Sequence, residues 1–226
     1  MLSVGRLDVP VSSFKLGEVD YSRIARMGEE NERRVVVQYP PFRLWNKMQN
    51  SSVITGKALE RYFALNDALR EFALLFQEEN NERAAAIVGA AFLDTLLENI
   101  LINYFRDDDK EVERLLGTDR PLGSFGSRAS LVYCLGFINK VIRDDLRLVG
   151  KIRNRFAHDL NVSFNDDPIR TWCFSLKWHE TSMMMKAPEG ATPGDVFQVG
   201  VNQLVTYLNG IVGLARIEKR RPEPEP

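Results

Sequence analysis

Cysteine and histidine are scarce in this sequence. Its 226 residues contain two cysteines, Cys134 and Cys173, and two histidines, His158 and His179. The cysteines do not form a C-x-x-C pair, so neither a disulfide scaffold nor a cysteine zinc site is encoded. Two histidines are too few for a multi-histidine metal centre within one chain. We therefore expect no metal ion and no cofactor.

Neither sign of charge is in excess, since 30 lysines and arginines stand against 31 aspartates and glutamates and the formal net charge is -1. A protein that coats nucleic acid through bulk positive charge is therefore not expected, and any such binding needs a local patch. Apolar residues make up 44% of the chain and charged residues 27%, which are proportions of a folded globular domain and not of a disordered chain.

A secretory signal and a long uncharged apolar run are also missing. The first ten residues have no apolar segment and carry charge, which excludes a secretory signal there. The most apolar stretch, Ala84–Phe105, contains Asp94 and Glu98, which argues against a membrane span. These features predict a cytoplasmic protein with no membrane segment.

The chain divides into three parts by composition. Residues 1–55 contain scattered glycines and prolines and lack a helical period, so we expect an N-terminal arm that is partly extended or flexible and could dock a protein partner. Residues 56–218 carry successive segments of helical periodicity, which predict an all-α bundle of five to seven helices. Residues 219–226, KRRPEPEP, predict a disordered tail.

The segment Arg83–Phe105 is the predicted central helix of this bundle. Sixteen of its last 22 positions are apolar, and a helix that is apolar nearly all round is buried nearly all round. Small side chains at Ala84–Ala86 and Gly89–Ala91 allow neighbouring helices to pack closely against it.

The residues best suited to catalysis form the motif RNRFAH, at the end of a helix predicted over Asn139–Ala157. Asn154 and His158 are four residues apart and share a face, and Arg153 is near enough in sequence to border the same pocket. An imidazole can move a proton while a guanidinium takes the charge that grows on a phosphate, so the pair suits phosphodiester cleavage without metal. The alternative is a helix end stabilised by capping and an internal hydrogen-bond network.

Asp94 and Glu98 are four residues apart on one face of the central helix. Buried carboxylates must be paired or protonated, because an isolated buried charge is strongly unfavourable. They could orient the RNRFAH side chains, or they could form an internal ion pair that sets the register of the helices. The candidate cationic partners are Arg83, Arg128 and Arg153.

The helix that ends in RNRFAH is also the most basic segment of the chain. Against Asp144 and Asp145 it carries six cations, a local charge of +4, which suits either a phosphate-facing ridge or a solvated face. These cations are Lys140, Arg143, Arg147, Lys151, Arg153 and Arg155.

Four segments follow one another in the order and spacing of the mannitol operon repressor family, and the chain resembles that family over about residues 60–180. They are Ala84–Glu98, Arg120–Asn139, Leu146–His158 and Ser163–Ile169. The resemblance implies a helical bundle that forms a homodimer and acts as a non-enzymatic transcriptional regulator, a repressor or co-regulator. Members of the family lack an obvious helix-turn-helix, so the resemblance also implies that regulation works through protein partners.

The bundle also resembles the wider HEPN superfamily, whose hallmark is an arginine followed four to six residues later by a histidine. In its ribonuclease members these two residues of both protomers meet across a dimer interface and cut RNA without metal. Arg153 and His158 match the hallmark, and Asn154 matches the polar residue that often follows the arginine. The resemblance keeps open a second function, a metal-independent endoribonuclease of a toxin or defence system. Asn154 and either Asp94 or Glu98 would then orient the catalytic pair.

Overall fold

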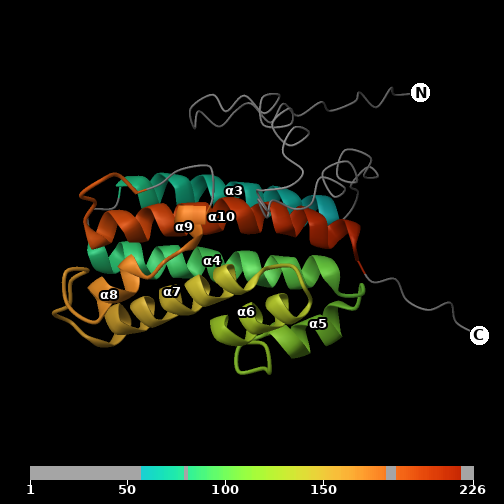
Figure 1. Cartoon of the computed structure of the whole chain (residues 1–226). Coiled ribbons are helices and arrows are strands. Elements are labelled where there is room, and N and C mark those ends of the chain that lie inside the picture. The colour runs from blue at the N-terminus through green and yellow to red at the C-terminus, as the bar shows by residue number, and fades with distance from the viewer. Residues whose placement is uncertain (1–56, 79–80, 182–186, 220–226) are drawn as a thin grey trace, which may run out of the picture. The chain divides into compact units, whose positions relative to one another are not determined.

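Helices account for all the regular structure in the computed structural model, which describes residues 57–78, 81–181 and 187–219 (Figure 1). The described ranges contain no strand, and seven of their helices have six residues or more, so the predicted all-α bundle is confirmed there. The predicted arm, residues 1–55, and residues 220–226 of the predicted tail lie outside the described residues. The helices are α3 (Lys57–Glu78), α4 (Glu82–Tyr104), α5 (Asp109–Leu116), α6 (Phe125–Cys134), α7 (Lys140–His158), α8 (Ile169–Phe174), the four-residue α9 (Trp178–Thr181) and α10 (Pro193–Ile217).

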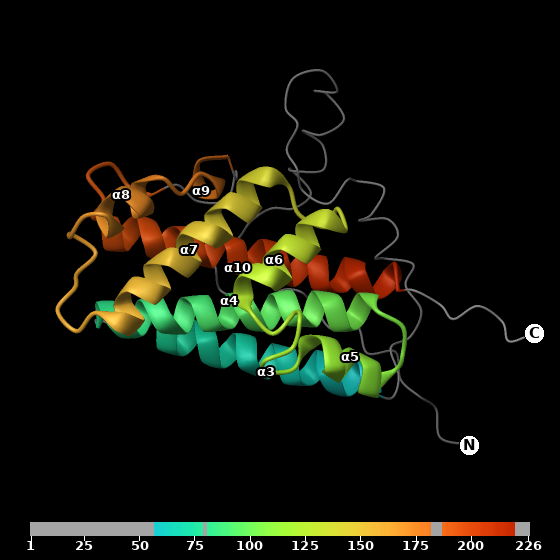
Figure 2. The ribbon, with the colours of Figure 1, turned by 90° about the horizontal axis from the view of Figure 1, so that it is seen from below.

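The central helix of the bundle is α4, as its composition predicts. It packs against α3 and α10 on one side and against α6 and α7 on the other (Figures 1 and 2). By length and composition alone α4 could cross a membrane, but about half of its most apolar stretch is buried against these four helices. The apolar character of α4 is therefore accounted for by its place in the core.

Two glycines mark where helices approach most closely. A side chain at Gly89 of α4 would place its Cβ 3.0 Å from Phe76 of α3 and 3.2 Å from Val201 of α10. A Cβ at Gly150 of α7 would lie 3.2 Å from the ring of Phe125 in α6. Both contacts are tighter than ordinary van der Waals packing, so the absence of a side chain at these positions allows the helices to approach.

The helix starts follow from side-chain capping. Asn81 accepts hydrogen bonds from the backbone N–H groups of Arg83 and Ala84, at 3.0 and 3.2 Å, and so caps α4 as expected for an asparagine at this place. Helix α10 begins at Pro193. The reason is a capping box between Thr192 and Asp195, together with a proline in the first turn, where its missing N–H is not needed.

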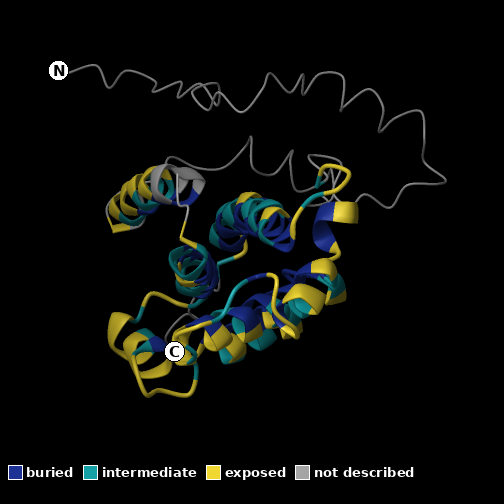
Figure 3. Ribbon diagram, turned by 90° about the vertical axis from the view of Figure 1, so that its left-hand side faces the viewer, coloured by how far each residue is buried: buried dark blue, intermediate teal, exposed yellow. Residues whose placement is uncertain are grey.

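Helix α7 lies obliquely across α4 and buries one face against the bundle (Figure 2). The five large apolar side chains of that face are completely buried: Ile142, Leu146, Val149, Ile152 and Phe156. Figure 3 shows the same division throughout the described helices, with buried segments facing one another and exposed segments turned outward. Of the α7 positions between these five residues, Asp145 is also buried and the others are exposed or half-buried.

Candidate functional site

The RNRFAH motif forms the last two turns of α7, which ends at His158 with Asp159 as its C-cap. Phe156 anchors this end, because its ring meets that of Phe164 with centroids 4.8 Å apart and is completely buried. Asn154 and His158 are exposed, whereas Arg153 is half-buried. The motif therefore buries the ring of Phe156 in the core, exposes Asn154 and His158 to solvent and leaves Arg153 partly exposed.

Arg153 and His158 leave α7 in different directions. Successive residues of an α-helix are about 100° apart, so Asn154 and His158 are separated by roughly 40° and Arg153 and His158 by roughly 140°. The fully buried Val149 lies about 40° from Arg153, on the side of the helix that faces the bundle. The predicted shared face of Asn154 and His158 is therefore present, and a site that joins Arg153 to His158 needs a group from outside this helix.

The loop after α7 is held by two charged side chains at the start of α4. The guanidinium of Arg83 donates through Nη1 to the carbonyl of Phe156 and through Nη2 to the carbonyl of Asp159. Glu82 accepts a hydrogen bond from the backbone N–H of Phe164, at 2.9 Å. A cation at the carbonyl end of a helix satisfies orphan acceptors and complements the helix dipole. Arg83 thus caps α7 and does not pair with Asp94 or Glu98.

Most side chains of the motif are not used in this capping. Arg155 forms an ion pair with Asp159, with 2.7 Å between Nη1 and Oδ2. Among the residues that the structure describes, no hydrogen bond or ion pair engages the side chains of Arg153, Asn154 or His158. The internal hydrogen-bond network that the sequence allowed as an alternative is therefore not formed by these three side chains within the described part of the chain.

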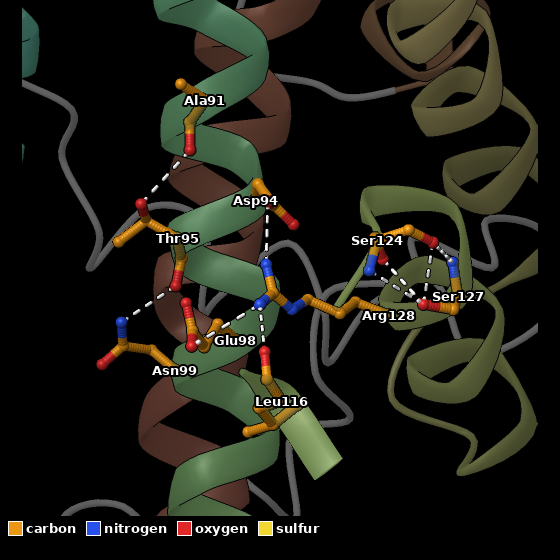
Figure 4. Close-up of polar contacts among 9 residues, drawn as sticks. All are labelled: Ala91, Asp94, Thr95, Glu98, Asn99, Leu116, Ser124, Ser127 and Arg128. Atoms are coloured by element: carbon orange, nitrogen blue, oxygen red, sulfur yellow. Dashed lines mark hydrogen bonds and ion pairs between the residues drawn. The ribbon is translucent and has the colours of Figure 1, made fainter. Parts of the chain in front are cut away.

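Asp94 and Glu98 lie elsewhere on α4, beside Arg128 of α6 (Figure 4). Arg128 is buried, donates to Asp94 Oδ2 and to the carbonyl of Leu116 at 2.8 Å each, and lies 3.6 Å from Glu98. Partial burial raises the pKa of Glu98, and the charge of Arg128 opposes that rise. This cluster joins α4, α6 and the end of α5, so of the three predicted cationic partners the structure selects Arg128.

The two groups of candidate site residues are separate within this chain. Arg83 of α4 contacts the end of α7, and Asp94 follows Arg83 by 11 residues, or about 16 Å of helix. Glu98 is one further turn away from that contact. Neither carboxylate forms a hydrogen bond or an ion pair with the side chains of Arg153 or His158 in the described ranges. That Asp94 or Glu98 orients the RNRFAH side chains stays a prediction, because no such contact forms within the described part of this single chain.

One carboxylate, that of Asp145, has an environment that its place in the sequence does not reveal. Asp145 of α7 is 2% exposed and accepts hydrogen bonds from the backbone N–H groups of Lys177 and Trp178, the latter at 2.7 Å. Burial raises its pKa to about 6, although these bonds act in the opposite direction. Asp145 therefore links α9 to α7 through hydrogen bonds. The only signal of this role in the sequence is a charged residue among the apolar positions of the helical repeat.

No group of three or more histidine, cysteine, aspartate or glutamate side chains lies close enough to hold a metal ion within the described residues. The thiol of Cys173 is buried among apolar side chains, and burial raises its pKa to about 12. A thiol with so high a pKa is not a nucleophile near neutral pH.

Comparison with known proteins gives consistent matches. The family model of the mannitol repressor matches residues 75–206, more than half of the chain. The mannitol operon repressors of Escherichia coli strain K12 and of Escherichia coli O6:H1 are each 35% identical over 92 residues, which cover 38% of this chain and 47% of the relative. The chain thus spans about half the length of the curated relatives it matches.

A solved structure shows a more distant likeness. The X-ray structure of the MtlR–HPr complex from Escherichia coli contains a chain that is 22% identical, with a TM-score of 0.48, and the match covers 66% of this chain and 99% of that one.

The family match runs from the end of α3 well into α10 and so includes α4, the Arg128 cluster and the whole of α7. The chain therefore belongs to the mannitol repressor family.

Proposed function

We propose that this protein is a non-enzymatic transcriptional regulator, a repressor or co-regulator, that acts through protein partners. The observation that carries the proposal is the family match over residues 75–206, which takes in most of the described bundle. The 35% identity to two mannitol operon repressors supports the same function, although it covers about half of their length. We also propose that the protein is cytoplasmic.

A protein partner is part of this proposal. The Escherichia coli MtlR is known in complex with HPr, and that partner belongs to that protein. For the present chain we infer a partner of its own, because the family resemblance implies regulation without a DNA-reading module. We also infer a homodimer, whose mass in solution would be about twice the chain mass of 25.8 kDa. Sedimentation or light scattering at micromolar concentration tests the dimer.

Deletion of the gene in its own host tests the regulatory function. A limited set of transcripts is expected to change when the gene is removed and to return to normal when the wild-type gene is supplied. The purified chain alone should not bind the promoters of those genes tightly and specifically. Unchanged transcripts after deletion would contradict regulation, and tight sequence-specific binding by the chain alone would contradict the requirement for a partner.

A second candidate function is a metal-independent endoribonuclease of the HEPN type. The observation in its favour is that Arg153, Asn154 and His158 are present together and that Asn154 and His158 are exposed. Because Arg153 and His158 diverge by roughly 140° on α7, their convergence on one phosphate would need the second chain of a dimer. In that arrangement Arg153 would stabilise the charge on phosphorus and His158 would transfer the proton.

Incubation with total RNA in the presence of a metal chelator separates the two functions. A ribonuclease predicts cleavage by the wild type that is lost in both Arg153→Ala and His158→Ala. Arg70→Ala is a matched control, because Arg70 is an exposed arginine of α3 whose nearest carboxylate is 3.6 Å away. A regulator predicts intact RNA in all four samples.

A further inference from the structure

The solvent face of α7 carries a row of basic side chains. We call these residues the basic stripe: Lys140, Arg147, Lys151, Arg155 and His158, all of which are exposed. Their spacing keeps them within about 80° around the helix, over a length of roughly 27 Å. Of the two aspartates in α7, Asp145 is buried against α9, so Asp144 alone balances the cations on the exposed face. Four of the six lysines and arginines of α7 therefore lie on one side of the helix, with Asp144 beside them.

Several charges of the basic stripe remain available. No carboxylate among the described residues forms an ion pair with Lys140 or Lys151. Arg147 lies 3.9 Å from Asp144, and an exposed pair at that distance contributes little. Arg155 is paired with Asp159, but half of its side chain is still exposed. The exposed face of α7 consequently attracts anionic groups, although Asp144 and Asp159 add some negative charge to it.

An exposed apolar side chain adjoins the stripe. Leu160 follows His158 by two residues and is 86% exposed. Helix α8 packs against α7. Between the two helices, Lys151 lies over the ring of Trp172 with its Nζ 5.9 Å from the centroid. A basic surface bordered by aromatic and aliphatic side chains has the composition of a protein–protein interface.

The loop that carries Leu160 is already ordered. Arg83 holds the carbonyls of Phe156 and Asp159, and Glu82 holds the backbone of Phe164, so the chain is fixed on both sides of Leu160. Single exposed leucines are common at protein surfaces and have no special meaning. A leucine on a loop that is fixed on both sides differs, because little conformational entropy is lost when a partner binds it.

We propose that the basic stripe, together with Leu160, is the docking surface for a protein partner whose own surface presents carboxylates beside an apolar patch. This inference rests on the proposed function, in which regulation works through a partner, and it names the surface and the chemistry of that partner. The carboxylates would meet Lys140 and Lys151, which have no counter-charge in the described part of the chain. The apolar patch would cover Leu160.

Nucleic acid fits this surface less well than protein. Asp144 and Asp159 lie within the stripe, and Asp166 and Asp167 are exposed in the loop that leads to α8. A phosphate backbone is uniformly negative and would be repelled by these carboxylates, whereas a protein surface can match both signs of charge. The exposed Leu160 likewise gains more from an apolar protein surface than from phosphate.

A synthetic peptide serves as the probe. It is a fluorescently labelled helix of about 18 residues, or about 27 Å, with glutamates along one face and leucines along the other. We expect it to bind the full chain in a salt-dependent way, and each of Lys151→Glu and Leu160→Asp to weaken binding about tenfold. Exchange of the glutamates for lysines in the peptide should abolish binding to the wild type.

Two controls make the result decisive. Arg70→Glu reverses an exposed charge on α3 and should leave peptide binding unchanged. A single-stranded oligonucleotide of about 20 nucleotides tests the other class of ligand. The proposal is overturned if the oligonucleotide binds and Lys151→Glu removes that binding while the peptide does not bind. It is also overturned if the peptide fails to bind the wild type, or if Arg70→Glu weakens binding as much as Lys151→Glu does.

The deletion strain separates a failure of this surface from a failure of the proposed function. If the gene regulates transcription through the stripe, Lys151→Glu and Leu160→Asp will not restore the transcripts, whereas Arg70→Glu will. If both stripe variants restore them fully, the regulator stands and the docking surface is wrong. If deletion alters no transcript, the regulatory function fails, and the peptide measurements alone then decide whether the stripe binds acidic protein surfaces.

Discussion

Replacement of Asp145 by asparagine is expected to change how the stability of the fold depends on pH. Asp145 is buried, and its two carboxylate oxygens accept hydrogen bonds of 2.7–3.1 Å from the backbone N–H groups of Lys177 and Trp178. Burial disfavours the charged carboxylate and raises its pKa from 3.8 to about 6. The folded chain therefore binds this proton more tightly than the unfolded chain does.

The sign and size of the effect follow from that difference in pKa. The stabilisation from protonated Asp145 is fully present below pH 3.8, and it is lost as the pH rises through about 6. A rise of about two pKa units corresponds to roughly 3 kcal/mol. We therefore expect the free energy of unfolding of the wild type, minus that of Asp145→Asn, to fall by about 3 kcal/mol between about pH 4 and about pH 7.

Urea unfolding followed by circular dichroism at a series of pH values measures this difference. Burial lowers the pKa of the neighbouring His179, but that histidine is present in both chains and its contribution largely cancels. Asp144→Asn is the matched control, since it makes the same change at a half-exposed position of the same helix. A difference that stays constant or increases with pH would refute the claim that burial dominates at Asp145.

Further predictions concern the packing of the bundle. Arg128→Met should lower the free energy of unfolding by about 2–3 kcal/mol, because it leaves two partly exposed carboxylates beside a buried carbonyl, whereas Arg155→Met at the surface should cost less than about 1 kcal/mol. Equal losses in thermal unfolding would contradict this account. Gly89→Ala should destabilise by about 1–3 kcal/mol, since its Cβ would lie 3.0 Å from Phe76. Gly126→Ala should stabilise by about 0.5–1 kcal/mol, because nothing lies within 4 Å of its Cβ in α6. Similar values for the two glycines in chemical denaturation would show that close packing does not decide their effects.

Local sequence signals predicted the helices well. The apolar content of α4 predicted its central place, and Asn81, one of the two asparagines that precede it, caps its start. Helix α7 begins and ends within one residue of the predicted Asn139–Ala157. These features depend on interactions between residues three or four apart, or on the overall apolar content of one segment, and both can be read along the chain.

The partners of the charged residues could not be predicted in the same way. Arg83, Arg128 and Arg153 were equal candidates for Asp94 and Glu98, and only the packing of α6 on α4 brings Arg128 to them. Arg83 instead caps α7, because the start of α4 lies beside the end of that helix. Such contacts join residues that are 30 or more positions apart, and no local pattern records which elements meet.

The amino-acid sequence by itself determined that this protein is an all-α bundle of the mannitol repressor family, because periodicity, capping residues and motif order are local properties of the chain. Only the tertiary structure decided what the RNRFAH motif presents. It buries Phe156, leaves His158 on the solvent face and aligns His158 with the basic stripe, and it keeps Asp94 and Glu98 in a separate cluster. The physical reason is that the direction of each side chain depends on which face of its helix is covered by other helices, and that is settled by packing across the whole bundle.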